Sequence, residues 1–232
     1  MQTEIPKFMS LQVDAVADFI CPWCYLGKSR LEQALTHIQG DDPPKVLWHP
    51  FQLNPDMPVE GMSFDEYLDK RFGGRELVQP FLDELTVVGE KEGIIFRFDQ
   101  LERIPNTLNA HRLIQIAGPG PQQNRLVDLL FSNFFEHGRD IGDHDLLSVL
   151  ARQAGLDAEA IGRFQRWDSG LAEVRAEEKH LRQLGVSGVP NYILNGKYAV
   201  AGAQDADALV RVFDQVLFDG DGSNPATSSR VH

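Results

Sequence analysis

The pattern of hydrophobic and polar positions divides the chain into three parts. In the first part, residues 11–20 alternate between apolar and polar side chains and predict a strand that runs directly into Cys21. Apolar residues at helical spacing then run from Pro22, which suits a first helical turn, to a stop at Gly40. Residues 45–53 predict a second strand. A strand, a helix and a strand in about 40 residues form a βαβ unit with parallel strands.

The other two parts differ in their periodicity. From residue 63 to residue 185 the apolar positions recur at helical spacing almost throughout, although residues 93–98 fit either a short strand or an extended connector. Two short β-like runs then flank Asn195-Gly196, a dipeptide that predicts a hairpin turn. Residues 206–217 predict a closing helix, so the chain ends in a ββα unit.

This order of elements predicts an α/β domain built from two separated segments. The βαβ half over residues 8–62 and the ββα half over residues 185–218 each have too few strands to form a sheet alone. Together they predict one mixed sheet with helices on its faces, and residues 63–184 are then a helical insertion. Residues 219–232 are polar and rich in Gly, Ser and Pro, which predicts a solvated tail.

Composition and charge exclude several classes of function. The 232 residues include 22 Lys and Arg against 34 Asp and Glu, and this formal net charge of −12 argues against a protein that binds nucleic acid through its phosphates. No stretch approaches the ~20 consecutive apolar residues that span a bilayer, and the N-terminus lacks the pattern of a secretion signal. We therefore expect a cytoplasmic protein without nucleic-acid or membrane partners. The oligomeric state, monomer or homodimer, stays open.

Two cysteines carry the candidate chemistry, and both lie in the single C-x-x-C of Cys21 and Cys24. A disulfide-stapled secreted domain needs more cysteines, spread along the chain. A structural zinc site needs about four ligands, and no second C-x-x-C completes one here. We therefore predict a redox-active dithiol and no metal site. Two alternatives remain open, namely a pair of buried cysteines without function and a metal site that recruits histidines.

The start of a helix gives the two cysteines different expected roles. Unpaired N–H groups and the helix dipole stabilise a thiolate there, so Cys21 is expected to be the exposed nucleophile. Cys24, one turn on, is expected to be buried and to attack a mixed disulfide at Cys21. Trp23 is expected near the surface, where its ring can contact a substrate. Asp14 and Asp18 share a mixed strand face and are expected to be solvated; alternatively, one of them is buried behind Cys24 and accepts its proton.

Four other residues have structural interpretations that compete with functional ones. His111 lies in a helical pattern and is expected to be a packed or capping histidine. Asn106 suits the N-cap of that helix or, alternatively, the active-site cleft. His49 lies in a predicted strand and is expected in the core. Pro190, in the segment GVSGVP, is expected at the start or edge of a strand and is a candidate for a cis peptide bond, although a plain loop proline is favoured on this segment alone.

Most of the chain resembles one protein family. The segments that carry the resemblance are CPWCYLGKSRL, HPFQLNPDMP, NTLNAHRL and GVPNYILNGKYAVAGAQ. They are similar to the FrnE branch of the DsbA family of thiol–disulfide oxidoreductases, and they extend from residue 21 to residue 204. The resemblance implies an α/β thioredoxin-like fold (βαβ + ββα) with a large all-helical insertion, in agreement with the pattern of elements.

Residue roles follow from the resemblance within the CPWC motif. Cys21 matches the nucleophilic cysteine and Cys24 the resolving cysteine. Pro22 and Trp23 match the intervening pair that tunes the reduction potential and contacts the substrate. The implied activity is that of a dithiol–disulfide oxidoreductase or isomerase, with no bound cofactor beyond the redox-active disulfide between the two cysteines.

The resemblance also assigns the substrate side of the site. Pro190 matches the cis-proline of the family, and Val189 matches the residue whose backbone pairs with an extended substrate, a form of β-augmentation. The implied partners are proteins or low-molecular-weight compounds that carry thiols or disulfides, with glutathione as an optional co-substrate.

A second group of enzymes in the same superfamily provides the main alternative. Glutathione-dependent 2-hydroxychromene-2-carboxylate isomerases and kappa-class glutathione transferases resemble this chain in residues 49–58 and 106–113, so His49 and Asn106 are candidates for a glutathione or substrate cleft. Those enzymes typically carry serine at the position of Cys21, which favours the oxidoreductase. The alternatives are a glutathione-dependent isomerase or transferase that acts on a small aromatic, and a non-catalytic module that binds peptides or metal.

Overall fold

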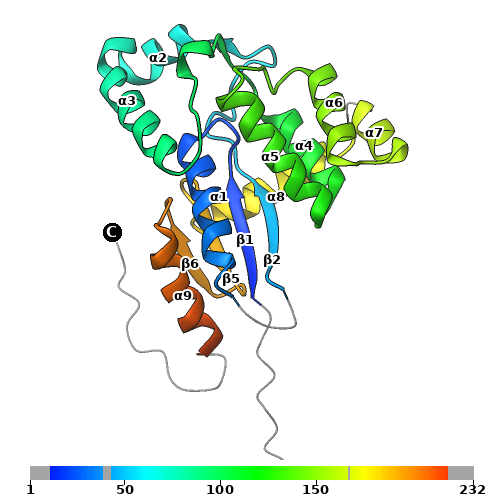
Figure 1. Ribbon diagram of the computed structural model, residues 1–232. Helices are drawn as coiled ribbons and strands as arrows, with labels where there is room; N and C mark the ends of the chain where they lie inside the picture. The colour runs from blue at the N-terminus through cyan, green and yellow to red at the C-terminus, as the bar shows by residue number, and fades with distance from the viewer. Residues whose placement is uncertain (1–10, 39–42, 167, 219–232) are drawn as a thin grey trace, which may run out of the picture.

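A computed structural model describes residues 11–38, 43–166 and 168–218 of the chain. Its centre is a four-stranded sheet in the order β2-β1-β5-β6 (Figure 1). The strands are β1 (Gln12–Ala17), β2 (Lys45–Pro50), β5 (Asn191–Leu194) and β6 (Tyr198–Ala201). β1 pairs with β2 in parallel and with β5 antiparallel, and β5 pairs with β6 antiparallel. The two halves of the chain therefore share one mixed sheet, and the predicted thioredoxin-like fold is confirmed.

Helices cover both faces of this sheet. They are α1 (Pro22–Leu35), α8 (Leu171–Gln183) and α9 (Ala206–Phe218). On one face α1 packs against α9, and on the other face α8 contacts β2 (Figure 1). Successive side chains of a strand point to opposite faces. Val16 of β1 accordingly packs with Phe51 and with Leu181 of α8, in a cluster separate from the main core.

The segment between the two halves forms a layer over the carboxyl ends of β1 and β2 (Figure 1). Its elements are β3 (Met62–Ser63), α2 (Phe64–Phe72), α3 (Arg75–Lys91), the 3-10 turn Phe98–Gln100, β4 (Arg103–Ile104), α4 (Leu108–Ala117), α5 (Pro121–Phe135), α6 (His144–Ala154) and α7 (Ala158–Gln165). The insertion is mostly helical, as predicted. It also contains a short antiparallel pair, β3 with β4, in which Met62 lies opposite Ile104.

The first strand ends earlier than predicted. β1 ends at Ala17, and the next three residues form a turn in which the N–H of Cys21 donates to the carbonyl of Asp18 at 3.1 Å. The apolar pattern continues through this turn because Phe19 and Ile20 are buried beneath the insertion. An alternating pattern therefore extends beyond the strand without marking its end.

Other predicted boundaries have mixed outcomes. Residues 93–98 form no strand, and they lead from α3 into the 3-10 turn that begins at Phe98. α8 contacts the sheet, although the predicted limits place it in the insertion, and those domain limits stay a prediction. Gly40, the predicted helix stop, and the predicted tail over residues 219–232 lie outside the described residues.

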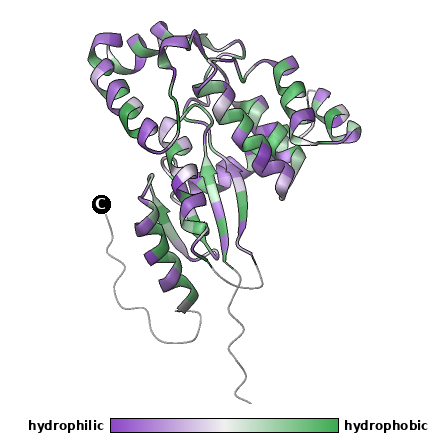
Figure 2. Ribbon diagram, viewed as in Figure 1, coloured by the Kyte–Doolittle hydropathy of each residue, from purple (hydrophilic) through white to green (hydrophobic). Residues whose placement is uncertain are grey.

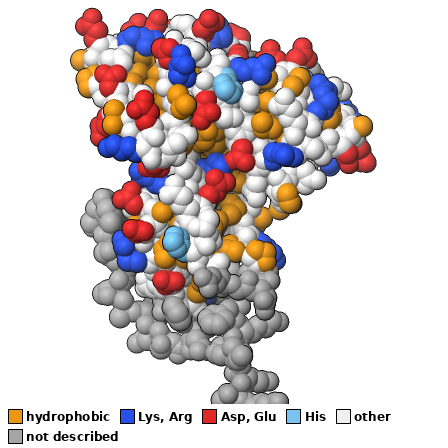
Figure 3. Space-filling view, in the orientation of Figure 1, with side chains coloured by type: hydrophobic (Ala, Val, Ile, Leu, Met, Phe, Trp, Pro, Cys, Tyr) orange, Lys and Arg blue, Asp and Glu red, His pale blue; other side chains and the backbone are white. Residues whose placement is uncertain are grey.

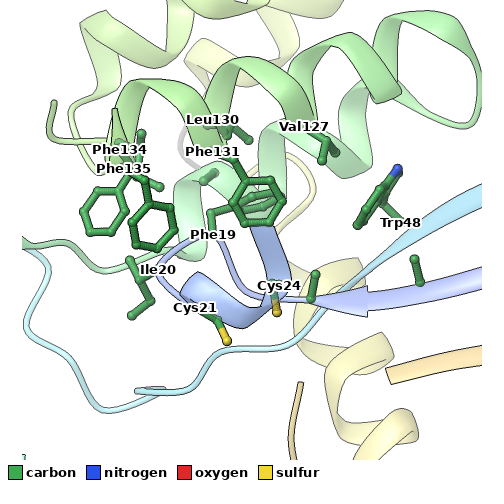
Figure 4. Close-up of a cluster of buried hydrophobic side chains, with 14 of the residues drawn as sticks. Phe19, Ile20, Cys21, Cys24, Trp48, Val127, Leu130, Phe131, Phe134 and Phe135 are labelled. Carbon is green, nitrogen blue, oxygen red and sulfur yellow. The ribbon is translucent and has the colours of Figure 1, made fainter. Parts of the chain in front are cut away.

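Aromatic side chains join the insertion to the sheet half. The ring centroid of Phe19, in the turn before α1, lies 5.2 Å from that of Phe131 on α5 (Figure 4). Tyr25 of α1 stacks on the same Phe131 ring at 5.1 Å. At the periphery, the guanidinium of Arg30 donates to the carboxylate of Glu92, just after α3. These contacts fix the insertion over α1. Hydrophobic and hydrophilic residues alternate along the helices of the insertion (Figure 2).

The surface carries charges of both signs. Acidic and basic side chains are interspersed over the visible face of the insertion, with hydrophobic side chains between them (Figure 3). Within the part of the chain that the structure describes, no helix is long and apolar enough to cross a membrane.

The predicted hairpin between β5 and β6 is confirmed. Asn195 and Gly196 have φ angles of 48° and 67°, the left-handed backbone that a type I′ turn requires at both central positions. The N–H of Lys197 donates to the carbonyl of Leu194 at 3.0 Å and closes the turn. The Asn195 side chain also accepts from the N–H of Gln12 at 2.8 Å, which ties the hairpin to the start of β1.

α1 approaches β5 closely at Gly27. A Cβ at this position would collide with the hydroxyl oxygen of Tyr192 and lie 3.0 Å from Cγ of Pro190. Glycine is otherwise unfavourable inside a helix, because it lowers helix stability relative to alanine. The close approach of the strand accounts for glycine here.

We expect Gly27→Ala to lower the free energy of unfolding by about 1–3 kcal/mol, because the new methyl group overpacks the contact between α1 and β5. Gly162 of α7 is the matched control, since nothing lies within 4 Å of a Cβ placed there. Gly162→Ala should raise stability by about 0.5–1 kcal/mol through helix propensity. Urea unfolding measures both. Equal effects of the two substitutions would contradict the close approach.

Candidate active site

The cysteine pair lies at the first turn of α1. Cys21 is the N-cap residue, with extended backbone angles of φ −91° and ψ 112°, and Pro22 opens the helix. The N–H of Cys24 donates to the carbonyl of Cys21 at 3.0 Å, so the two residues are one turn apart. Both thiols are free. Cys21 thus lies at the end of the helix where N–H groups lack intrahelical acceptors, although among the described residues its side chain accepts no capping hydrogen bond from them.

The expectation that Cys21 is exposed is wrong. Its exposed fraction is 5%, against 1% for Cys24. The loop before β5 lies over it, and the Cys21 thiol donates to the carbonyl oxygen of Val189 at 3.7 Å. Residues 168 positions apart in the sequence therefore meet at the Cys21 sulfur. Cys24 is the more deeply buried of the two, as predicted.

The loop over Cys21 contains the second sequence motif. The peptide bond between Val189 and Pro190 is cis. Pro190 is buried, Val189 is half-buried, and the carbonyl of Pro190 accepts from the N–H of Gly202 at 2.8 Å. This hydrogen bond continues the pairing of β5 with β6 and fixes the loop beside the cysteine pair.

The environment of Cys24 disfavours its thiolate. Burial raises the pKa of the Cys24 thiol well above its ordinary value, and the hydrogen bond and charge of Cys21 raise this pKa further. The backbone N–H of Asp18 donates to the sulfur and opposes the shift. Cys24 is consequently a thiol at neutral pH and needs a proton acceptor before it can act as a nucleophile.

Asp18 is fully buried behind the pair, so the expectation of a solvated carboxylate is wrong at this position. One carboxylate oxygen accepts from the N–H of Leu53 at 2.7 Å. The other lies 3.4 Å from Nε2 of His111, a buried residue of α4, and neither of these two atoms has a hydrogen-bond partner among the described residues. The predicted packing of His111 is confirmed, because its ring lies 5.0 Å from that of Phe19.

His49 and Asp14 form a different cluster. The two ring nitrogens of His49 lie 2.9 Å from Oδ1 of Asp14 and 2.5 Å from Oε1 of Glu177 on α8. Asp14 is therefore ion-paired and not merely solvated. These contacts direct His49 toward the face of the sheet that α8 covers, whereas the cysteines lie on the side of α1. The structure therefore does not bring His49 together with the cysteine pair.

The polar atoms of Asn106 are all engaged within the protein. Its side-chain oxygen accepts from the N–H of Leu108 at 3.0 Å and from the Gln52 amide at 3.2 Å. Its amide nitrogen donates to the carbonyl of Met57 at 2.6 Å. The expected capping role is close to what is observed, although Thr107 is the N-cap residue of α4. Asn106 thus holds the segment after β2 against α4.

The two residues between the cysteines lie at the edge of the site. Pro22 and Trp23 are both half-buried. The indole of Trp23 lies 6.2 Å from the ring of Phe81, an exposed residue of α3. Trp23 is thus available to a molecule that approaches the pair. Across residues 11–38, 43–166 and 168–218, no group of three or more His, Cys, Asp or Glu side chains could hold a metal ion.

Comparison with known proteins agrees with this geometry. Residues 12–214 match the model of the DSBA-like thioredoxin domain. The chain belongs to the DsbA family. A probable DsbA oxidoreductase from Streptomyces coelicolor has a similar structure, with a TM-score of 0.81, 30% identity and 94% of each chain covered. Protein YwbO of Bacillus subtilis is 26% identical over 91% of this chain and 98% of its own length.

The relation to the isomerases is also confirmed at the level of the fold. The structure of a 2-hydroxychromene-2-carboxylate isomerase is similar to this DsbA family member with a TM-score of 0.68 and 16% identity, over 90% of this chain and 97% of that one. Assignment to the FrnE branch within the family stays a prediction.

The His49 cluster predicts a pH dependence of stability. Burial alone lowers the pKa of His49, but the hydrogen bonds with Glu177 and Asp14 outweigh it and raise the pKa above 6.5. The folded protein therefore binds this proton more tightly than the unfolded chain does. The resulting stabilisation is fully present below pH 6.5, and it is lost as the pH rises through the raised pKa of His49 in the folded protein.

Urea unfolding of the parent and His49→Gln over a series of pH values measures this dependence. The difference in the free energy of unfolding between the parent and His49→Gln should decline as the pH rises from 6.5 through the raised pKa of His49, because His49 then loses its proton. An advantage that stays constant with pH would show that the two carboxylates do not hold a protonated imidazole.

Proposed function

We propose that this DsbA family member is a dithiol–disulfide oxidoreductase or isomerase that exchanges disulfides through Cys21 and Cys24. The observation that carries the proposal is the geometry of Cys21, at the N-cap of α1 and 3.7 Å from the Val189 carbonyl, one turn from a buried thiol. A nucleophilic sulfur, a resolving sulfur and a backbone surface for a substrate are the three parts that such an exchange needs.

The proposed reduction of a substrate proceeds in two steps. The Cys21 thiolate attacks one sulfur of a substrate disulfide, and the other substrate sulfur leaves as a thiolate. Cys24 then loses its proton and attacks the sulfur of Cys21. The Cys21–Cys24 bond forms, the bond to the substrate breaks, and the second substrate thiolate leaves. Two electrons pass from the dithiol to the substrate, and the reverse sequence oxidises a substrate dithiol.

Asp18 is the proposed acceptor of the Cys24 proton. Its carboxylate is fully buried next to the resolving cysteine, and one of its oxygens has no hydrogen-bond partner among the described residues. His111, 3.4 Å away, is the group that can share a proton with that oxygen. General-base assistance suits Cys24 because burial otherwise holds it in the thiol form.

The surface around Cys21 suggests how a substrate is held. The Val189 backbone offers an edge for an extended peptide, and the half-buried ring of Trp23 offers an apolar contact. We propose proteins or low-molecular-weight disulfides as substrates, with glutathione as a co-substrate. In the reducing cytoplasm that the sequence predicts, reduction or isomerisation is favoured over net oxidation.

The glutathione-dependent isomerase is the competing enzyme, and it differs in what it needs from Cys24. An isomerase would use Cys21 to bind or activate glutathione and would not need the resolving thiol. Turnover of a hydroxychromene carboxylate that survives Cys24→Ser would favour it over the oxidoreductase. Stoichiometric zinc in protein purified without added metal would favour the non-catalytic module.

The two cysteine variants test the proposed function. Cys21→Ser should abolish reduction of a model disulfide, because it removes the attacking sulfur. Cys24→Ser should accumulate mixed disulfides at Cys21, which intact-mass measurement under non-reducing conditions detects. Full disulfide reductase activity in Cys21→Ser would exclude the mechanism.

The role of Asp18 predicts a selective defect. With the aromatic disulfide DTNB, the reduced protein should release one thionitrobenzoate when Cys21 attacks and a second when Cys24 resolves the adduct. Asp18→Asn should slow the second release about 100-fold, the lower range of general-base contributions. Asp14→Asn is the matched control and should leave both releases unchanged. An unaltered second release in Asp18→Asn would remove Asp18 from the mechanism.

A further inference from the structure

The phenol of Tyr192 is a buried polar group that the exchange mechanism leaves without a role. Tyr192 is on β5, two residues after Pro190, and its exposed fraction is 1%. Its hydroxyl has no hydrogen-bond partner among the residues that the structure describes. A buried hydroxyl without a partner is unfavourable, which points to a partner in another state of the protein.

The neighbours of the hydroxyl place it on the face of α1 that carries the resolving cysteine. It lies against Gly27, whose missing side chain makes room for the oxygen. Residues three apart lie on one face of a helix, so Gly27 and Cys24 share the face of α1 that packs on the sheet. Across the sheet, Tyr192 is paired with Ala15 of β1, and paired residues of neighbouring strands point to the same face of the sheet.

The protonation of Tyr192 makes its hydroxyl a donor. Burial raises the pKa of Tyr192 well above its ordinary value, and negative charge on Cys24 and Cys21 raises this pKa further, while Arg30 opposes them. The phenol therefore keeps its proton over the whole pH range in which the cysteines exchange disulfides. A group that is always protonated can offer a hydrogen bond to a thiolate, but it cannot accept the proton of a thiol.

We propose that the Tyr192 hydroxyl donates a hydrogen bond to the Cys24 thiolate during resolution of the mixed disulfide. The inference rests on the proposed function and adds a residue to it. In this step the proton of Cys24 passes to the Asp18 carboxylate or to solvent. The thiolate then attacks the sulfur of Cys21, the Cys21–Cys24 bond forms, and the substrate sulfur leaves with the electron pair of the broken bond. Tyr192 keeps its proton throughout.

The DTNB reaction tests this assignment with Tyr192→Phe, which removes only the oxygen. The first release of thionitrobenzoate reports attack by Cys21 and should be unchanged. The second release reports attack by Cys24 and should be slower by about tenfold at neutral pH, as expected for the loss of one hydrogen bond to a charged sulfur. Its pH profile should also shift to higher pH, because the thiolate of Cys24 is less stable without the donor.

Tyr198→Phe is the matched control, since Tyr198 is a half-buried residue of the neighbouring strand β6. It should change neither release. A second release in Tyr192→Phe with the rate and pH profile of the parent would overturn the assignment. Equal slowing of both releases, or slowing in Tyr198→Phe as well, would indicate altered packing and would overturn it too.

The same measurement separates this inference from the proposed function. If the parent protein releases only one thionitrobenzoate, Cys24 does not resolve the adduct and the oxidoreductase itself is wrong. If the parent releases two and Tyr192→Phe behaves like the parent, the oxidoreductase stands and only the role of Tyr192 fails.

Discussion

The turn between β1 and α1 is the constraint on which the site depends. Its three residues, 18–20, reverse the chain over a short distance, and the hydrogen bond from Cys21 to the Asp18 carbonyl closes it. This turn sets Cys21 at the N-cap of α1, where helix N–H groups are unpaired, and puts Cys24 one turn deeper. Because Phe19 packs between Phe131 and His111, the insertion holds the turn in place.

The two parts of the chain contribute different properties to the cysteine pair. The sheet half supplies the positions of the sulfurs and the Val189 carbonyl that lies over Cys21. The insertion supplies burial, because α4 and α5 cover the turn that contains Asp18. Burial raises the pKa of Cys24 and so protects it from external oxidants and disulfides, but the same burial requires a nearby group that takes its proton. In the mechanism that we propose, the buried Asp18 and His111 meet that requirement within the core.

Local signals in the sequence predict much of this arrangement. The βαβ and ββα order, the turn at Asn195-Gly196 and the C-x-x-C at a helix start all follow from short-range patterns, and each is observed. The burial of Cys21 and Asp18 is different, because it depends on Val189 and on helix α4, which are far away in the sequence. The pairing of His49 with Glu177 is likewise a contact between distant segments. Alternating polarity in a strand cannot show which of its polar residues a later helix will cover.

The central claim is that Cys21 and Cys24 form one two-electron redox couple. An equilibrium titration of the purified protein in glutathione buffers, followed by thiol alkylation and intact mass, tests it most directly. The account predicts one transition between a dithiol and an intramolecular disulfide, with both cysteines lost to alkylation together, and its midpoint places the protein among reductants or oxidants. Persistent single glutathione adducts, or thiols protected by a bound metal, would contradict it.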